Sequence, residues 1–150
     1  MNYFIDTNII IDLINTGNST TVKEARQKAT ELLKPILEAS ESKIYINRLV
    51  MIESLRTIKY IETGIFRRAE ETLENFERLD ITQEIYDEAI AFSRFCQSIG
   101  ATTSNKGNCQ VLDFLHFITA KHYNLEILTY DTKDFNTMMK AYPKFKETNQ

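Results

Sequence analysis

Two carboxylates follow apolar runs that have the composition of buried strands. Asp6 comes directly after residues 3–5, and Asp131 follows the run 127–129 with one residue between them. Runs of β-branched and aromatic residues are typical of strands, and an open parallel sheet binds its ligands at the carboxyl ends of its strands. If both runs belong to one such sheet, the two carboxylates lie at the same edge. An ordinary turn or N-cap role is the alternative for Asp131.

Two further carboxylates stand in apolar stretches of helical character. We expect residues 111–118 to lie in a buried helix, where the charge of Asp113 is costly unless it is paired or bound to a metal. A hydrogen bond to His116, or a position near the helix start, is the alternative. Glu53 follows four apolar residues. A solvated glutamate, or one paired with Arg56, is the ordinary outcome at such a position, but the apolar run favours a packed one.

Acidic side chains that meet in one small site need a counter-charge, because they cannot all stay ionised together. Their hard oxygen ligands suit Mg²⁺ or Mn²⁺. The two histidines, His116 and His122, are not spaced as a ligand pair on one helix face. A divalent ion in an acidic site activates a bound water and neutralises the charge that develops on a phosphodiester. The candidate metal-binding and catalytic residues are Asp6, Glu53, Asp113 and Asp131.

The composition is that of a globular protein, and we expect one domain over residues 1–150. The net charge is −3, which argues at first against a nucleic-acid partner. If four of the 21 acidic residues share a metal site, however, 17 remain against 18 basic residues. Cys96 and Cys109 match no metal spacing and are expected to be reduced packing residues. With no secretory or membrane-spanning pattern, we expect a cytoplasmic protein.

Strand and helix patterns alternate along the chain. Strands are expected at 3–5, 43–46, 78–81 and 126–129, and helices at about 9–14, 22–37, 48–63, 66–76, 85–99 and 111–123. Asn47 and Thr82 are expected to cap the helices that follow them, and Gly100 to end the helix at 85–99. Pro35 predicts a kink or a break in the second helix, and the tail from Phe135 is weakly specified. Such alternation predicts an α/β fold, a three-layer α/β/α sandwich with a central, mainly parallel sheet.

The polar motifs also occur in a characteristic order. They are Asp6-Thr7-Asn8 after the first strand, Glu53 on the helix after the second strand, Asp113 on a late helix, and Thr129-Tyr130-Asp131 with Asp134-Phe135 after the last strand. This order, from residue 3 to residue 135, resembles the PIN domain family, and in particular the VapC-type toxins of bacterial toxin–antitoxin pairs.

The resemblance implies a metal-dependent ribonuclease that uses Mg²⁺ or Mn²⁺, forms a homodimer and is held inactive by a cognate antitoxin. It makes Asp6, Glu53, Asp113 and Asp131 the metal-site acids. Three further residues would support them, Asn8 and Thr129 by hydrogen bonding and Asp134 as an accessory acid. The family pattern has smaller or aliphatic residues where this chain has Phe114, His116 and Phe117.

Other functions fit parts of the pattern. A phosphatase of the haloacid dehalogenase type would need a second aspartate at the position of Asn8. A non-catalytic PIN module that binds RNA or protein as a scaffold remains the main alternative, and it would need neither a metal nor Asp6 for binding. RNA-binding residues are not assigned; the cationic candidates are Arg48, Arg56, Lys59, Arg67, Arg68 and Lys106, which ordinarily would form a solvated face.

Overall fold

The computed structural model describes residues 1–101 and 110–148, so Lys106 and Cys109 lie outside the described part of the chain. The chain forms two compact units. The first, which we call the sheet unit, comprises Met1–Asp80 and Leu125–Tyr130. The second, the helical unit, comprises Ile81–Asn124 and Asp131–Gln150.

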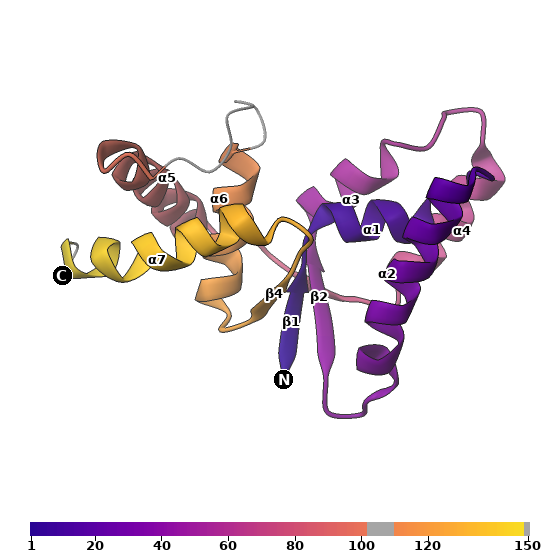
Figure 1. Cartoon of the computed structure of the whole chain (residues 1–150), viewed down its shortest axis with the longest axis horizontal. Helices are drawn as coiled ribbons and strands as arrows, with labels where there is room; N and C mark the ends of the chain where they lie inside the picture. The colour runs from indigo at the N-terminus through magenta and orange to yellow at the C-terminus, as the bar shows by residue number, and fades with distance from the viewer. Residues whose placement is uncertain (102–109, 149–150) are drawn as a thin grey trace. The chain divides into compact units, whose positions relative to one another are not determined.

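A parallel sheet of four strands forms the centre of the sheet unit, in the spatial order β3-β2-β1-β4 (Figure 1). The strands are β1 (Asn2–Ile5), β2 (Lys43–Asn47), β3 (Glu77–Leu79) and β4 (Glu126–Leu128). Phe4 in β1 is in register with Tyr45 on one side and Ile127 on the other, so β1 is hydrogen-bonded along both edges. The predicted α/β class with a parallel sheet is therefore confirmed.

Helices follow directly from the first two strands. Asp6 ends β1 and caps α1 (Thr7–Ile14), and Asn47 ends β2 and caps α3 (Arg48–Leu55) by accepting a hydrogen bond from the Val50 N–H. A polar residue that lies between a strand and the helix it caps is held at the carboxyl edge of the sheet. This local arrangement positions the candidate site.

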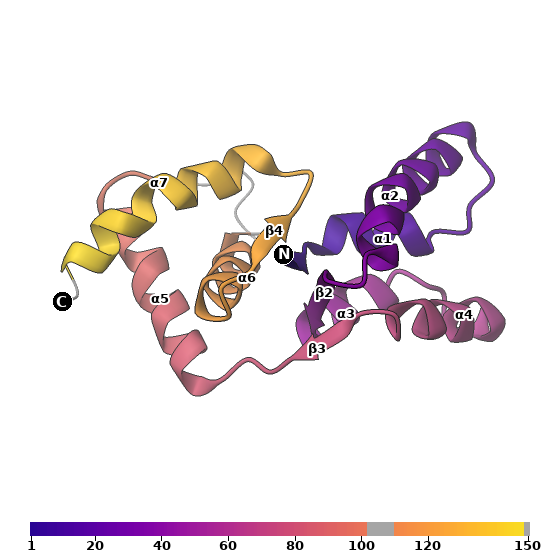
Figure 2. The same ribbon diagram turned by 90° about the horizontal axis from the view of Figure 1, so that it is seen from below.

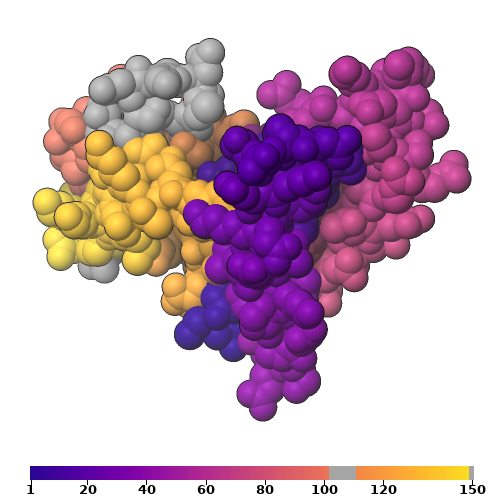
Figure 3. All heavy atoms as spheres, turned by 45° about the vertical axis from the view of Figure 1, so that its right-hand side comes forward, coloured from indigo at the N-terminus to yellow at the C-terminus, as the bar shows by residue number. Residues whose placement is uncertain are grey.

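The other helices of the sheet unit are α2 (Thr20–Glu38) and α4 (Thr63–Leu73). The outer face of α2 is visible in Figure 3, and Ala29 and Leu33 are its buried residues. The core of this unit is aliphatic, and each fully buried side chain of this kind contributes about 1.5–3 kcal/mol. Its fully buried members include Phe4, Ile5, Ile9, Ile10, Leu33, Ile44, Ile46 and Leu73.

Two predictions about these helices are wrong. Instead of one helix at 48–63, α3 ends at Leu55 and turns lead to α4, which contains Gly64 in its first turn. The hydroxyl of Ser54 donates to the Val50 carbonyl at 2.6 Å, and that of Thr57 donates to the Ser54 carbonyl at 2.7 Å. Such side-chain bonds compete with the backbone bonds that would extend the helix. The break expected at Pro35 is absent, since α2 runs without interruption from Thr20 to Glu38 and has Pro35 in its last four residues.

An aromatic cluster holds the helical unit together. Its helices are α5 (Gln83–Ser98), α6 (Gln110–His122) and α7 (Thr132–Thr148), which includes the tail expected to be weakly specified. Phe92 is fully buried, and its ring centroid lies 5.1–5.5 Å from those of Phe114, Phe117, Tyr142 and Phe145. Contacts of this kind add about 0.5–1.5 kcal/mol each beyond the area buried. Figure 2 shows the three helices from a second direction.

Several local predictions hold in the helical unit. Thr82 caps α5 through a hydrogen bond from the Ile85 N–H, and Gly100 follows the helix with a φ of 71°. Residues 114–120 of α6 are all buried, as the apolar sequence indicates. Cys96 is buried as well, and burial raises the pKa of its thiol to about 11. It is therefore a protonated packing residue. Among the described residues, no helix combines the length and apolar character needed to cross a bilayer.

Candidate active site

Asp6 lies at the carboxyl end of β1 and is 7% exposed. One carboxylate oxygen, Oδ1, accepts a hydrogen bond from the Thr7 N–H at 2.9 Å. The other, Oδ2, accepts from the Thr129 hydroxyl at 2.7 Å. The backbone N–H of Asp6 donates to the Leu128 carbonyl at 2.8 Å and so extends the pairing of β1 with β4. The short bonds to a charged acceptor hold the carboxylate in one orientation.

Glu53 is joined to the same strand end through Thr7. The Thr7 hydroxyl donates to Glu53 Oε1 at 2.9 Å, and Thr7 is 7% exposed. This bond connects the start of α1 with α3. It holds the half-buried side chain of Glu53 against Thr7, the residue that follows Asp6. Sequence reasoning did not single out Thr7, although its place between Asp6 and Asn8 was a signal that could have identified it.

Asn8 has a buried acceptor with no hydrogen-bond partner among the described residues, its side-chain Oδ1. A buried acceptor left in this state costs about 1–3 kcal/mol unless a water molecule or an ion satisfies it. Oxygen atoms of amides are among the ligands that hard divalent cations accept. The position of Asn8 in the first turn of α1 therefore fits a polar site better than a packed core.

The second group of carboxylates belongs to the helical unit. One ligand oxygen from each of Asp113, Asp131 and Asp134 can be chosen so that all lie within 4.8 Å of one another. Two oxygens on opposite sides of an octahedral Mg²⁺ are about 4.2 Å apart, since each bond is about 2.1 Å. These residues therefore fit a hard divalent ion after small side-chain rotations.

Asp113 occupies the alternative position near the helix start, and not the middle of a buried helix. It lies in the first turn of α6 and is half-buried. The positive end of the helix dipole favours a carboxylate there by about 0.3–1 kcal/mol. Further along α6, His116 is 1% exposed, and Phe114 and Phe117 pack against Phe92. Two of the three bulky residues that depart from the family pattern, Phe114 and Phe117, thus belong to the aromatic core, and the third, His116, is buried on the same helix.

Asp131 and Asp134 interact before any cation is considered. The Asp134 N–H donates to Asp131 Oδ1 at 3.3 Å, so Asp131 has the capping role that was its alternative interpretation. Asp134 is 6% exposed. Burial raises its pKa above the ordinary value, a hydrogen bond between its side chain and that of Asp131 and the charge of Asp131 raise it further, and Lys133 opposes the change. A bound cation would relieve the repulsion between the two carboxylates.

The predicted site residues are thus divided between the two units. Asp6 and Glu53, with Asn8 and Thr129, lie in the sheet unit. Asp113 and Asp131 lie in the helical unit together with Asp134, which sequence reasoning had ranked as an accessory. Arg56, the alternative partner of Glu53, lines a groove on the sheet unit.

The bond from Thr129 to Asp6 gives a stability prediction. In Thr129→Val the buried Oδ2 of Asp6 loses its donor, and hydrogen bonds to charged groups contribute about 1.5–3 kcal/mol. We expect the free energy of unfolding, measured by urea denaturation, to fall by about that amount. Thr129→Ser keeps the hydroxyl and should recover most of the loss. Equal stability of the valine variant and the wild type would mean that the bond contributes nothing.

The fold and its carboxylates define an α/β protein with acidic side chains suited to a hard divalent cation. The model of the PIN domain family matches residues 3–140, and the chain therefore belongs to that family. No curated protein matches the chain.

Two solved structures share the fold. One is VapBC2 from Rickettsia felis bound to a DNA fragment from their promoter, with a TM-score of 0.64, 17% identity, and coverage of 86% of this chain and 87% of that one. The other is FitAcB from Neisseria gonorrhoeae, with a TM-score of 0.62, 16% identity, and coverage of 91% and 92%. At this identity the likeness concerns the fold.

Proposed function

We propose that this protein is a metal-dependent endoribonuclease that hydrolyses RNA phosphodiester bonds, and that it is the toxin of a toxin–antitoxin pair. The observation that carries the proposal is the group of three carboxylates, Asp113, Asp131 and Asp134, in a chain that belongs to the PIN domain family. Converging carboxylates are suited to metal-assisted phosphodiester hydrolysis.

The proposed ion is Mg²⁺ or Mn²⁺, and the residues proposed to hold it are Asp6, Glu53, Asp113 and Asp131. When bound, such an ion lowers the pKa of a water molecule and neutralises charge on the phosphate. The chain's own contribution is orientation. Thr129 holds the Asp6 carboxylate, and Thr7 holds that of Glu53. Asn8 would offer its buried oxygen, and Asp134 would act as an accessory acid beside Asp131.

Chain connectivity supports a shared role for these acids. β1 and β4 are neighbouring parallel strands, so their carboxyl ends lie at one edge of the sheet. Asp6 directly follows the first strand, and Asp131 follows the second after two intervening residues. The family match also runs across both units. We accordingly propose that residues 1–150 act as one PIN-like domain.

The proposed partners follow from the VapC resemblance and from the two complexes that share the fold. We propose RNA as the substrate, a cognate antitoxin as the protein partner and a homodimer as the assembly, all in the cytoplasm. The alternative, a non-catalytic scaffold that binds RNA or protein, would leave the carboxylates without chemistry.

Cleavage of a mixed pool of small RNAs by the purified protein tests the proposal. We expect discrete products with Mg²⁺ or Mn²⁺ and none with a chelator, because the acids need the ion to bind a negatively charged phosphate. Adding excess Mn²⁺ back to the chelated sample should restore the products, which distinguishes loss of the ion from loss of the protein. Retention of RNA or of a protein partner with no cleavage in any condition would support the scaffold instead.

A further inference from the structure

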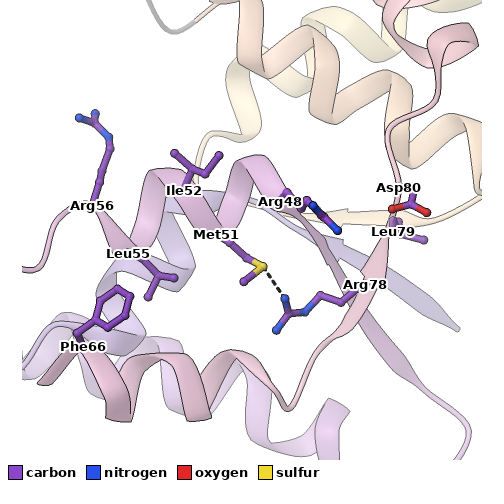
Figure 4. Close-up of a pocket in the computed structure, with 9 residues that line it drawn as sticks. All are labelled: Arg48, Met51, Ile52, Leu55, Arg56, Phe66, Arg78, Leu79 and Asp80. Carbon is purple, nitrogen blue, oxygen red and sulfur yellow. Dashed lines mark hydrogen bonds between the residues drawn. The ribbon is translucent and has the colours of Figure 1, made fainter. Parts of the chain in front are cut away.

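A large groove lies on the sheet unit, and its lining includes none of the residues proposed for catalysis. Its lining comes from α3, α4 and β3, and its volume is about 700 Å³ (Figure 4). Pockets that hold drug-sized ligands have about 300–1,000 Å³. The groove therefore has room for several side chains of a partner.

The floor of the groove is mainly aliphatic. Met51 and Leu55 reach it from α3, Leu79 from β3 and Phe66 from α4. Ile52, at the rim, is 60% exposed, and Phe66 is 38% exposed. Exposed apolar side chains gathered in a concave surface are typical of binding sites, because burying them against a partner removes apolar area from water.

Arginines stand at both ends of α3 and thus at both ends of the groove. Arg48 begins the helix and Arg56 follows its last residue. Arg78 crosses the floor from β3, where its guanidinium contacts the Met51 sulfur and donates to the Leu73 carbonyl at 3.4 Å (Figure 4). Asp80 is the one acidic residue in this lining. The groove is therefore locally basic, although the whole chain carries a net charge of −3.

A second pocket extends this surface past Phe66. It has a volume of about 550 Å³ and shares Leu55 and Phe66 with the groove. Its lining adds two cations, Lys59 and Arg67, one acid, Glu70, and also Tyr60, which is 99% exposed. The combined surface thus offers a continuous strip of apolar contacts with cations along it, a shape suited to an extended or helical segment.

We propose that this groove binds an acidic segment of a partner protein, one that places apolar side chains on the floor and carboxylates against the arginines. Arginine pairs with carboxylates through two parallel hydrogen bonds, and buried apolar anchors supply most of the energy of such interfaces. Single-stranded RNA would stack its bases on aromatic rings, and the combined surface has two, Phe66 and Tyr60. The part of the groove between Arg48 and Arg78 is lined by aliphatic side chains and Met51, which favours the apolar side chains of a protein segment there. The groove contains none of the proposed metal-site acids, so the proposal stands apart from catalysis.

Selection of displayed random peptides on the intact protein tests the proposal. We expect the selected peptides to combine Asp or Glu with Leu, Ile or Phe. For a labelled peptide of this kind, fluorescence anisotropy should show a Kd that rises at least about 10-fold in the double variant Arg48→Glu and Arg78→Glu. The Kd should also rise with salt concentration, because exposed charge pairs are screened.

The matched control reverses two exposed lysines of α2, Lys23→Glu and Lys34→Glu, which changes the net charge equally. This control should leave the Kd unchanged, and circular dichroism should show that both variants are folded. Three results would overturn the proposal: peptides without acidic residues, equal losses in the two variants, or displacement of the peptide by an oligouridylate. A dimer of the protein that dissociates only in the arginine variant would make a second copy the occupant, and would also contradict the proposal.

Discussion

Replacing Asp6 by asparagine is expected to lower the rate of RNA cleavage at least about 100-fold while the protein stays folded. The variant removes the charge that attracts the ion but keeps the shape of the side chain. Asparagine is as good an N-cap as aspartate, so the bond from the Thr7 N–H is preserved, and the new amide can donate to the Thr129 oxygen. The free energy of unfolding should therefore change by less than about 1 kcal/mol. Initial rates at saturating Mn²⁺, with urea denaturation of the same samples, give both quantities.

The matched control for this experiment is Asp12→Asn. Asp12 lies on the same helix, α1, and is half-buried, but it belongs to neither group of candidate acids. Its variant should retain the wild-type rate. Cleavage by Asp6→Asn at the wild-type rate would remove Asp6 from the proposed site, and loss in both variants would trace the effect to a general change in α1.

The second large effect concerns stabilisation by the metal and its loss in Asp113→Asn. An ion that binds the folded protein at about 100 times its Kd stabilises it by about 2.7 kcal/mol. For a chain of this size, that raises Tm by roughly 5–10 °C. If removal of the Asp113 carboxylate weakens binding about 100-fold, the same ion concentration gives about 0.4 kcal/mol and a shift of roughly 1–2 °C. Thermal melts with Mn²⁺ and with a chelator measure both shifts.

Asp87→Asn is the control here, because Asp87 is an exposed aspartate of the same unit whose side chain accepts a hydrogen bond from Gln83. Its Mn²⁺ shift should equal that of the wild type. The metal role would be refuted if Asp113→Asn unfolded the protein and the remaining folded fraction cleaved RNA at the wild-type specific rate. In that case the only role of Asp113 would be to stabilise the first turn of α6.

The sequence predicted those features that depend on short stretches of chain. Tyr3–Ile5 could be recognised as a strand from its own residues. An aspartate directly after such a strand lies at the edge of the sheet where ligands bind. The caps Asn47 and Thr82 were recognisable for the same reason, since an N-cap depends on a side chain and the turn that follows it.

Features that depend on competition or on distant partners were not predictable. Nothing local shows that the helix beginning at Arg48 ends at Leu55 and not near residue 63, because this end depends on hydroxyl groups that bond back to the carbonyls near the end of α3. Asp113 was placed in mid-helix because the apolar run continues on both sides of it. The bond between Thr7 and Glu53 joins residues 46 positions apart, and no spacing rule indicates it.

The position of β1 in the sheet has a consequence for synthesis of the protein on the ribosome. The first strand made is paired on one edge by β4, and Asp6 receives its hydrogen bond from a residue 123 positions later. Contacts between such distant segments form slowly and only after the later segment has left the ribosome. The nascent chain therefore exposes an unpaired edge of β1 until β4, Glu126–Leu128, has been made. A protein built in this way gains its complete sheet, and with it the ordered Asp6, only after these more than 120 intervening residues have been translated.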